Sequence, residues 1–130
     1  MTLKLTPELF VTNIEETIAF YEKLVPTKII ISVPQAAPRA WALANIDGCD
    51  VMFFTKDCTS PEVKLFAKQR TGQNVILYFD VPDKKTLDAI YAKAKKENAQ
   101  IIVDRYNTEY GSTEFSIKDN NGYVVSFAKH

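Results

Sequence analysis

Asp47-Gly48 is followed by the strand-like run Cys49-Asp50-Val51-Met52-Phe53-Phe54, and Asn121-Gly122 is followed by the strand-like run Tyr123-Val124-Val125-Ser126-Phe127. An Asp-Gly or Asn-Gly dipeptide between apolar runs is a strong signal for a β-hairpin. The two signals lie about 70 residues apart, which is too far for a solenoid repeat but suits two fused copies of one small module. The chain is therefore predicted to contain a duplicated module.

The first module begins with a strand at residues 8–12, followed by a helix. Asn13 can cap this helix, and Glu16, three residues later, completes a pair that resembles a capping box. Apolar residues then recur at helical spacing until Pro26 ends the helix. Strands are expected at residues 28–33, 40–46 and 49–55. The order of elements in this module is therefore βαβββ.

The second module repeats that order. It has a strand at residues 74–81, a helix after Pro82-Asp83, strands at 101–106 and 113–118, and a last strand that ends at residue 128. Residues 57–73 are polar and turn-rich, with one helical turn at 62–68, and are interpreted as a linker. We therefore predict a single α+β domain over residues 1–130, built from two tandem βαβββ modules at about 1–56 and 74–130.

Composition excludes several classes of partner. The chain has 16 basic and 16 acidic residues, so the formal net charge is zero and no basic stripe suggests a nucleic acid. No apolar run is long enough to span a membrane, and the start of the sequence has no signal-peptide pattern. We therefore expect a cytoplasmic protein without a membrane partner. The two cysteines form no CxxC motif, which argues against a zinc site.

Strand alternation divides each expected sheet into a face under the helix and an opposite, concave face. Aromatic rings with a few polar groups on the concave faces are typical of a site for a small organic molecule. The alternative is that these rings fill a core or a dimer interface. The expected ligand-binding residues are Glu8, Phe10, Trp41, Phe54, Tyr78, Tyr110 and Ser126.

The opening and the ending of the chain carry motifs that are found together in one known superfamily. Residues 9–21 form a strand, an amide cap and a helix that contains Phe20-Tyr21, and residues 110–123 run from Tyr110-Gly111 to the turn Asp119-Asn120-Asn121-Gly122. In this order and spacing, the motifs resemble the glyoxalase/bleomycin-resistance/dioxygenase superfamily, also called the vicinal oxygen chelate proteins. The resemblance covers essentially the whole chain. It implies paired βαβββ modules that form an open, barrel-like cleft, often completed by a homodimer.

The resemblance also implies where a metal would bind. Metal enzymes of that superfamily place four ligands, His or Glu with occasional Gln, on the first and last strands of the two modules. A divalent cation needs imidazole or carboxylate ligands, which a methyl group or a thioether cannot replace. The sole histidine, His130, is the last residue of the sequence and is expected to be frayed. We therefore expect no metal and no cofactor, because the matching positions are Thr6, Met52, Ile76 and Ser126.

These observations favour a metal-free protein that resembles the bleomycin-resistance branch and sequesters a small organic ligand as a homodimer. Aromatic walls suit a planar or partly apolar ligand, and Glu8, Asp80 or Arg39 could orient a charged group. The two acidic residues would favour a cationic ligand. The alternative is that both carboxylates are simply solvated at strand ends.

Two other functions remain open. One is a glyoxalase-like lyase, isomerase or dioxygenase that uses non-standard metal ligands or none, so whether the protein is an enzyme is undecided. Its acid–base residues would be Glu8, Asp50 or Glu114, with Tyr78 or Tyr110 as a hydrogen-bond donor. The other is an interaction module whose cleft is filled by side chains.

Overall fold

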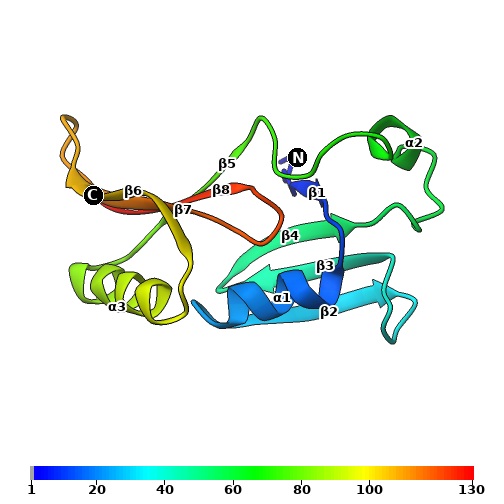
Figure 1. The fold of residues 1–130 in the computed structure, drawn as a ribbon, viewed down its shortest axis with the longest axis horizontal. Coiled ribbons are helices and arrows are strands. Elements are labelled where there is room, and N and C mark those ends of the chain that lie inside the picture. The colour runs from blue at the N-terminus through cyan, green and yellow to red at the C-terminus, as the bar shows by residue number, and fades with distance from the viewer. Residues whose placement is uncertain (1) are drawn as a thin grey trace. The chain divides into compact units, whose positions relative to one another are not determined.

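The computed structural model describes residues 2–130, and the chain divides into two compact units (Figure 1). Unit 1 ends at Thr71, and unit 2 covers Gly72–His130. Each unit has one four-stranded sheet that is open rather than closed into a barrel. The predicted α+β class and the two tandem βαβββ modules are confirmed. Within residues 2–130, no helix is both long enough and apolar enough to cross a membrane.

Unit 1 contains a mixed sheet with strand order β1-β4-β3-β2, in which β1 runs parallel to β4 and the other pairs are antiparallel. Most of the segment expected as a linker belongs to unit 1, because this unit extends to Thr71. The segment also contains the short helix α2. The prediction that residues 1–130 act as a single domain stays a prediction. The elements are β1 (Glu8–Phe10), α1 (Ile14–Glu22), β2 (Thr27–Val33), β3 (Trp41–Ile46), β4 (Cys49–Phe54) and α2 (Val63–Phe66).

Helix α1 forms where the capping signal predicted it. The Asn13 side chain accepts a hydrogen bond from the Glu16 backbone N–H at 2.7 Å, which satisfies one of the free donors of the first turn. The helix buries Ile14, Ile18 and Tyr21, and the Tyr21 ring stacks on Phe53 of β4. This packing fixes one face of the unit 1 sheet as core.

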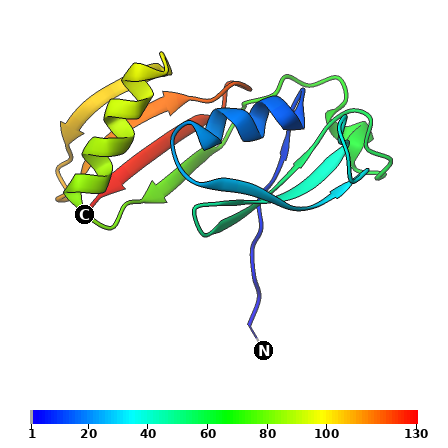
Figure 2. The same cartoon turned by 90° about the horizontal axis from the view of Figure 1, so that it is seen from below.

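Unit 2 repeats the topology with strand order β5-β8-β7-β6 and a parallel β5–β8 pair. Asp83 caps α3 by accepting from the Thr86 N–H at 2.7 Å, and α3 lies across one face of the sheet (Figure 2). Its buried residues meet a core in which the Phe115 and Phe127 rings stack. The elements are β5 (Ile76–Asp80), α3 (Lys84–Lys96), β6 (Gln100–Asn107), β7 (Thr113–Lys118) and β8 (Val124–Lys129).

The face of the unit 2 sheet opposite α3, called the polar face below, carries several polar side chains together with the exposed Ile76. Leu77 on β5 is buried under the helix, whereas Ile76, Tyr78 and Asp80 are exposed, as the alternation of residues along a strand predicts. On β7, Phe115 and Ile117 are fully buried in the core, so Glu114 and Ser116 point to the opposite face. This polar face brings the candidate functional residues of unit 2 together.

Candidate functional site

Glu114 lies at the centre of the polar face of unit 2. Glu114 is only 7% exposed, and its carboxylate accepts hydrogen bonds from four hydroxyl groups. Tyr78 and Ser112 donate to Oε2 at 3.1 Å, Tyr106 donates to Oε1 at 3.2 Å, and Tyr110 lies 3.3 Å from both oxygens. Hydroxyl donors stabilise a buried carboxylate, which is otherwise costly to desolvate. We call Tyr78, Tyr106, Tyr110, Ser112 and Glu114 the Glu114 cluster.

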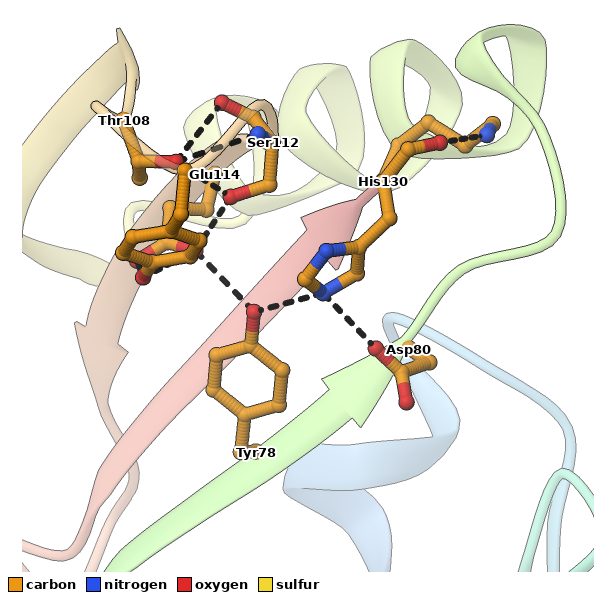
Figure 3. Close-up of polar contacts among 8 residues, drawn as sticks. Tyr78, Asp80, Thr108, Ser112, Glu114 and His130 are labelled. Carbon is orange, nitrogen blue, oxygen red and sulfur yellow. Dashed lines mark hydrogen bonds and ion pairs between the residues drawn. The ribbon is translucent and has the colours of Figure 1, made fainter.

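Strand pairing explains why these side chains meet. Tyr106 of β6 is directly opposite Glu114 of β7, and both are near the end where the β6–β7 connection turns back. That connection is tightened by Thr108, whose hydroxyl accepts the Ser112 N–H at 3.0 Å and lies 2.8 Å from Ser112 Oγ (Figure 3). The turn thereby directs Ser112 and Tyr110 back toward the carboxylate.

The cluster changes the acidity of two tyrosines. Partial burial of the hydroxyl raises the pKa of Tyr78 to about 12, and the hydrogen bond and negative charge of Glu114 act in the same direction. The pKa of Tyr106 is also raised, first by burial and then by the Glu114 charge. Both phenols are therefore held neutral as hydrogen-bond donors.

The rings of the cluster remain accessible although their hydroxyls point inward. Tyr78, Tyr106 and Tyr110 are 44%, 47% and 67% exposed. The site thus presents aromatic surface around a negative charge. Aromatic faces attract cations, and a nearby carboxylate adds to that attraction.

His130 extends this arrangement, and the expectation that this residue is frayed stays a prediction. Figure 3 shows that its imidazole contacts both Tyr78 and Asp80. The Nε2 atom of His130 lies 3.1 Å from the Tyr78 hydroxyl and 3.3 Å from Oδ1 of Asp80. Its ring centroid is 6.2 Å from that of Tyr78 and 6.3 Å from that of Tyr110. These contacts place the imidazole at the border of the Glu114 cluster.

The expected ligand-binding residues fall in two groups. In unit 2, Tyr78 and Tyr110 meet in the Glu114 cluster, and Ser126 lies on the same face, 5% exposed, with its Oγ 2.7 Å from Ser116 Oγ. In unit 1, Glu8 is exposed on β1 and pairs with Met52. The assignment of all seven expected residues to a ligand site stays a prediction.

The three aromatic residues expected in unit 1 pack together. Phe10 and Phe54 are buried in a cluster with Val63 of α2, and the half-buried Trp41 packs against it. Phe66 adds edge contacts, with its ring centroid 5.5 Å from that of Phe54. These rings form a small core under α2, which corresponds to the alternative that the sequence left open.

Other charged candidates are occupied by local partners. Arg39 donates to Glu15 at 2.9 Å and to Ser32 Oγ at 2.9 Å, so its guanidinium connects α1 to β2. Asp50 accepts from Lys4 at 2.5 Å and from Asn45 at 3.0 Å, and these two contacts lower the pKa of Asp50.

Sequence reasoning did not select Tyr106, Ser112 or His130 for the site. Ser112 lies in a turn, where alternation gives no direction. The pairing of β6 with β7 shifts between Val103 and Tyr106, so the alternation along β6 does not predict which way Tyr106 points. Its position directly opposite Glu114 becomes visible only in the three-dimensional register.

Comparison with known protein families identifies the family of this chain. Residues 5–127 match the model of the glyoxalase/bleomycin resistance protein/dioxygenase superfamily. The chain belongs to this superfamily. A comparison with curated protein sequences gives no match.

Several solved structures share this fold. TioX from Micromonospora sp. ML1 has a TM-score of 0.74 at 16% identity, covering 98% of this chain and 96% of its own. The fosfomycin resistance protein FosX from Listeria monocytogenes has a TM-score of 0.71 at 14% identity, with coverages of 100% and 94%. Lactoylglutathione lyase from Agrobacterium tumefaciens has a TM-score of 0.70 at 14% identity, with coverages of 99% and 94%. At this identity the likeness extends to the fold alone.

The positions that match the metal ligands of the superfamily do not fit a metal. They hold Thr6, Met52, Ile76 and Ser126, which supply at most two hydroxyls and a thioether. Ser126 Oγ is also engaged with Ser116. Within residues 2–130, no group of three or more His, Cys, Asp or Glu side chains is arranged to hold a metal ion.

Proposed function

We propose that this superfamily member binds a small organic ligand, cationic or aromatic, on the polar face of unit 2 without the help of a metal. The observation that carries this proposal is the Glu114 cluster, in which a buried carboxylate is surrounded by three partly exposed tyrosine rings. The rings offer apolar and π surface, and Glu114 with the exposed Asp80 offers negative charge. An anionic ligand would be repelled by the same groups.

The mode of action that fits such a site is sequestration, as in the bleomycin-resistance branch. Binding then needs only shape, aromatic surface and charge, and no reacting group. Glu8, Phe10, Trp41 and Phe54 of unit 1 stay proposed ligand contacts. Within unit 1, Glu8 and the half-buried Trp41 offer surface that a ligand can contact. The buried Phe10 and Phe54 would act by supporting the Trp41 ring. We also propose that the protein acts as a cytoplasmic homodimer.

A titration tests the binding proposal. Cationic aromatic compounds, bleomycin-like glycopeptides, hemithioacetals and catechols are added to ¹⁵N-labelled protein, and amide shifts and product formation are followed together. Tyr110→Ala should weaken binding of a cationic aromatic ligand about two- to fivefold, as expected for an exposed cation–π contact of about 0.5–1 kcal/mol. Leu65→Ala is the matched control, because Leu65 is also 67% exposed but lies on α2.

The metal content of the purified protein distinguishes metal-free binding from metal-dependent catalysis. Because the matching positions lack imidazole and carboxylate ligands, elemental analysis of untagged protein should give far less than one equivalent of zinc, nickel, manganese or iron. A stoichiometric metal that survives dialysis would contradict the metal-free proposal.

The second candidate is a metal-independent lyase or isomerase of the glyoxalase-like type. It is favoured by one observation, the direct hydrogen bond between the Tyr78 phenol and the Glu114 carboxylate, which could act as an acid–base pair. Saturable shifts without turnover support sequestration. Product formation that is lost in Glu114→Gln supports the enzyme.

A further inference from the structure

The position of the His130 ring resembles that of a bound ligand. One ring nitrogen, Nε2, faces two acceptors, the Tyr78 phenol oxygen at 3.1 Å and the Asp80 carboxylate at 3.3 Å. The Tyr78 hydroxyl donates its own hydrogen to Glu114, so Nε2 must be the donor in its contact with Tyr78. The Tyr110 ring centroid lies 6.3 Å from that of the imidazole, and the two ring planes are tilted by 31°.

These contacts combine an N–H donor, a carboxylate and aromatic rings. That is the chemistry by which proteins recognise planar organic cations, since such cations donate in their plane and are attracted by ring faces. We propose that the His130 imidazole occupies a ligand subsite made by Tyr78, Asp80 and Tyr110, and that this subsite takes a planar nitrogen cation of the amidine, guanidine or imidazole class. The inference rests on the proposed function, which it makes more specific.

An amidinium group fits this subsite better than His130 does. Imidazole Nε2 carries one hydrogen, which has to serve both Tyr78 and Asp80. An amidinium or guanidinium has several N–H donors in one plane and can give one hydrogen to each acceptor. The external ligand therefore gains a hydrogen bond that the internal one lacks.

The internal contact is also weak enough to be displaced. The side chains of His130 and Asp80 are 52% and 75% exposed, so water and salt screen their attraction. The imidazole thus acts as a competitor that covers the subsite until a ligand replaces it. If it covers the subsite in about four of five molecules, its removal tightens ligand binding about fivefold.

The test compares wild type with His130→Ala, using benzamidine as the probe and benzamide as its neutral isostere. Binding is measured by amide chemical shifts of ¹⁵N-labelled protein. We expect benzamidine to bind His130→Ala about fivefold more tightly than wild type, with shifts at Tyr78 and Tyr110, and benzamide to bind neither protein. In the His130→Ala background, Asp80→Asn should weaken benzamidine binding. Glu97→Gln, an equal charge change at the end of α3, should not.

The outcomes distinguish this inference from the proposed function. Equal benzamidine affinity in wild type and His130→Ala would overturn the role of His130 while leaving ligand binding in place. Equal binding of benzamide would overturn the cationic class. If neither protein responds to benzamidine or to the aromatic compounds of the wider titration, the proposed function fails and the inference fails with it.

Discussion

Glu114 accepts hydrogen bonds from three phenols and one serine, and each donor comes from a different residue of unit 2. Glu114→Gln replaces one acceptor oxygen with an NH₂ group that faces hydroxyl donors. Loss of these charge-assisted hydrogen bonds should lower the free energy of unfolding by about 1–3 kcal/mol at neutral pH. Urea denaturation measures this loss. Glu109→Gln, which removes the same charge from an exposed position in unit 2, should change stability little.

The same substitution should change the titration of Tyr78. Its folded-state pKa of about 12 lies above the ordinary value of 10.0, so the folded protein holds this proton more tightly than the unfolded chain does. The contribution of Tyr78 to wild-type stability should therefore be fully present and independent of pH below the unfolded pKa, and it should be lost as the pH rises toward about 12. In Glu114→Gln the tyrosinate absorbance should develop at lower pH. An unchanged alkaline titration would show that Glu114 does not contribute to the shift.

Among single residues, the sequence pointed to some members of the Glu114 cluster and not to others, for physical reasons. Tyr78 could be predicted because it alternates with Leu77 and Phe79 along an unbroken strand. Glu114 was identified only as one of several acid–base candidates, because no sequence pattern shows that four hydroxyls converge on it. His130 was missed, since its partners Asp80 and Tyr78 lie about 50 residues away on a neighbouring strand.

At the scale of elements, local chemistry was a good guide. Asn13 and Asp83 both cap helices, and the Asp47-Gly48 turn joins β3 to β4 with both residues at positive φ. The polar segment after β4 was harder to interpret. Its short helix α2 is held by contacts of Val63 with Phe10 and Phe54, which are distant in sequence. Sequence alternation alone placed those two rings on an open face.

The core under α2 leads to a stability prediction. Phe54 is 4% exposed, so Phe54→Ala should leave a cavity and cost about 3–5 kcal/mol. Phe66→Ala is the control, because Phe66 contacts the same ring but is 37% exposed, and its loss should cost clearly less. Urea denaturation followed by fluorescence of Trp41, which packs against this core, measures both. Equal losses of stability in the two variants would contradict the argument that the more buried ring contributes more.

Turn geometry gives a second element-scale prediction. Gly72 and Gly111 have similar φ angles of +80° and +92°, but an added Cβ would lie 2.5 Å from the Asn121 backbone oxygen at Gly72 and would meet nothing within 4 Å at Gly111. Gly111→Ala should cost about 1–2 kcal/mol for its backbone conformation alone. Gly72→Ala should cost about 1–3 kcal/mol more, because the turn before β8 must move. Thermal unfolding ranks the two, and a reversed order would contradict the steric argument.

At the scale of the molecule, the duplication is preserved in the hydrogen-bond register. The Val11 N–H bonds to the Phe54 carbonyl in unit 1, and the Val81 N–H bonds to the Ala128 carbonyl in unit 2. Counting back along each strand makes Glu8 equivalent to Tyr78 and Met52 equivalent to Ser126. The two modules therefore share a backbone plan but carry different side chains at equivalent places. This divergence explains why the sequence identifies the superfamily but does not specify a ligand.

The whole-molecule prediction concerns oligomeric state. Strand β2 is the outer strand of the unit 1 sheet, and its Ile30, Ile31 and Val33 are 52%, 56% and 61% exposed. An edge strand with such apolar residues offers unpaired backbone groups and apolar area, and a second copy of the chain can satisfy both. Sedimentation equilibrium at micromolar concentration should therefore give twice the chain mass.

A charged substitution on β2 should show whether the dimer forms through this strand. In a two-fold symmetric dimer each substitution acts twice, so Ile31→Lys would place two like charges near one interface and weaken the dimer about tenfold or more. Leu65→Lys is the matched control, because Leu65 is equally apolar and 67% exposed but lies on α2 rather than on a sheet edge. If wild type remains monomeric at high concentration, the dimer is wrong. If Leu65→Lys dissociates the dimer and Ile31→Lys does not, a dimer forms, but through a surface that includes α2 instead of β2.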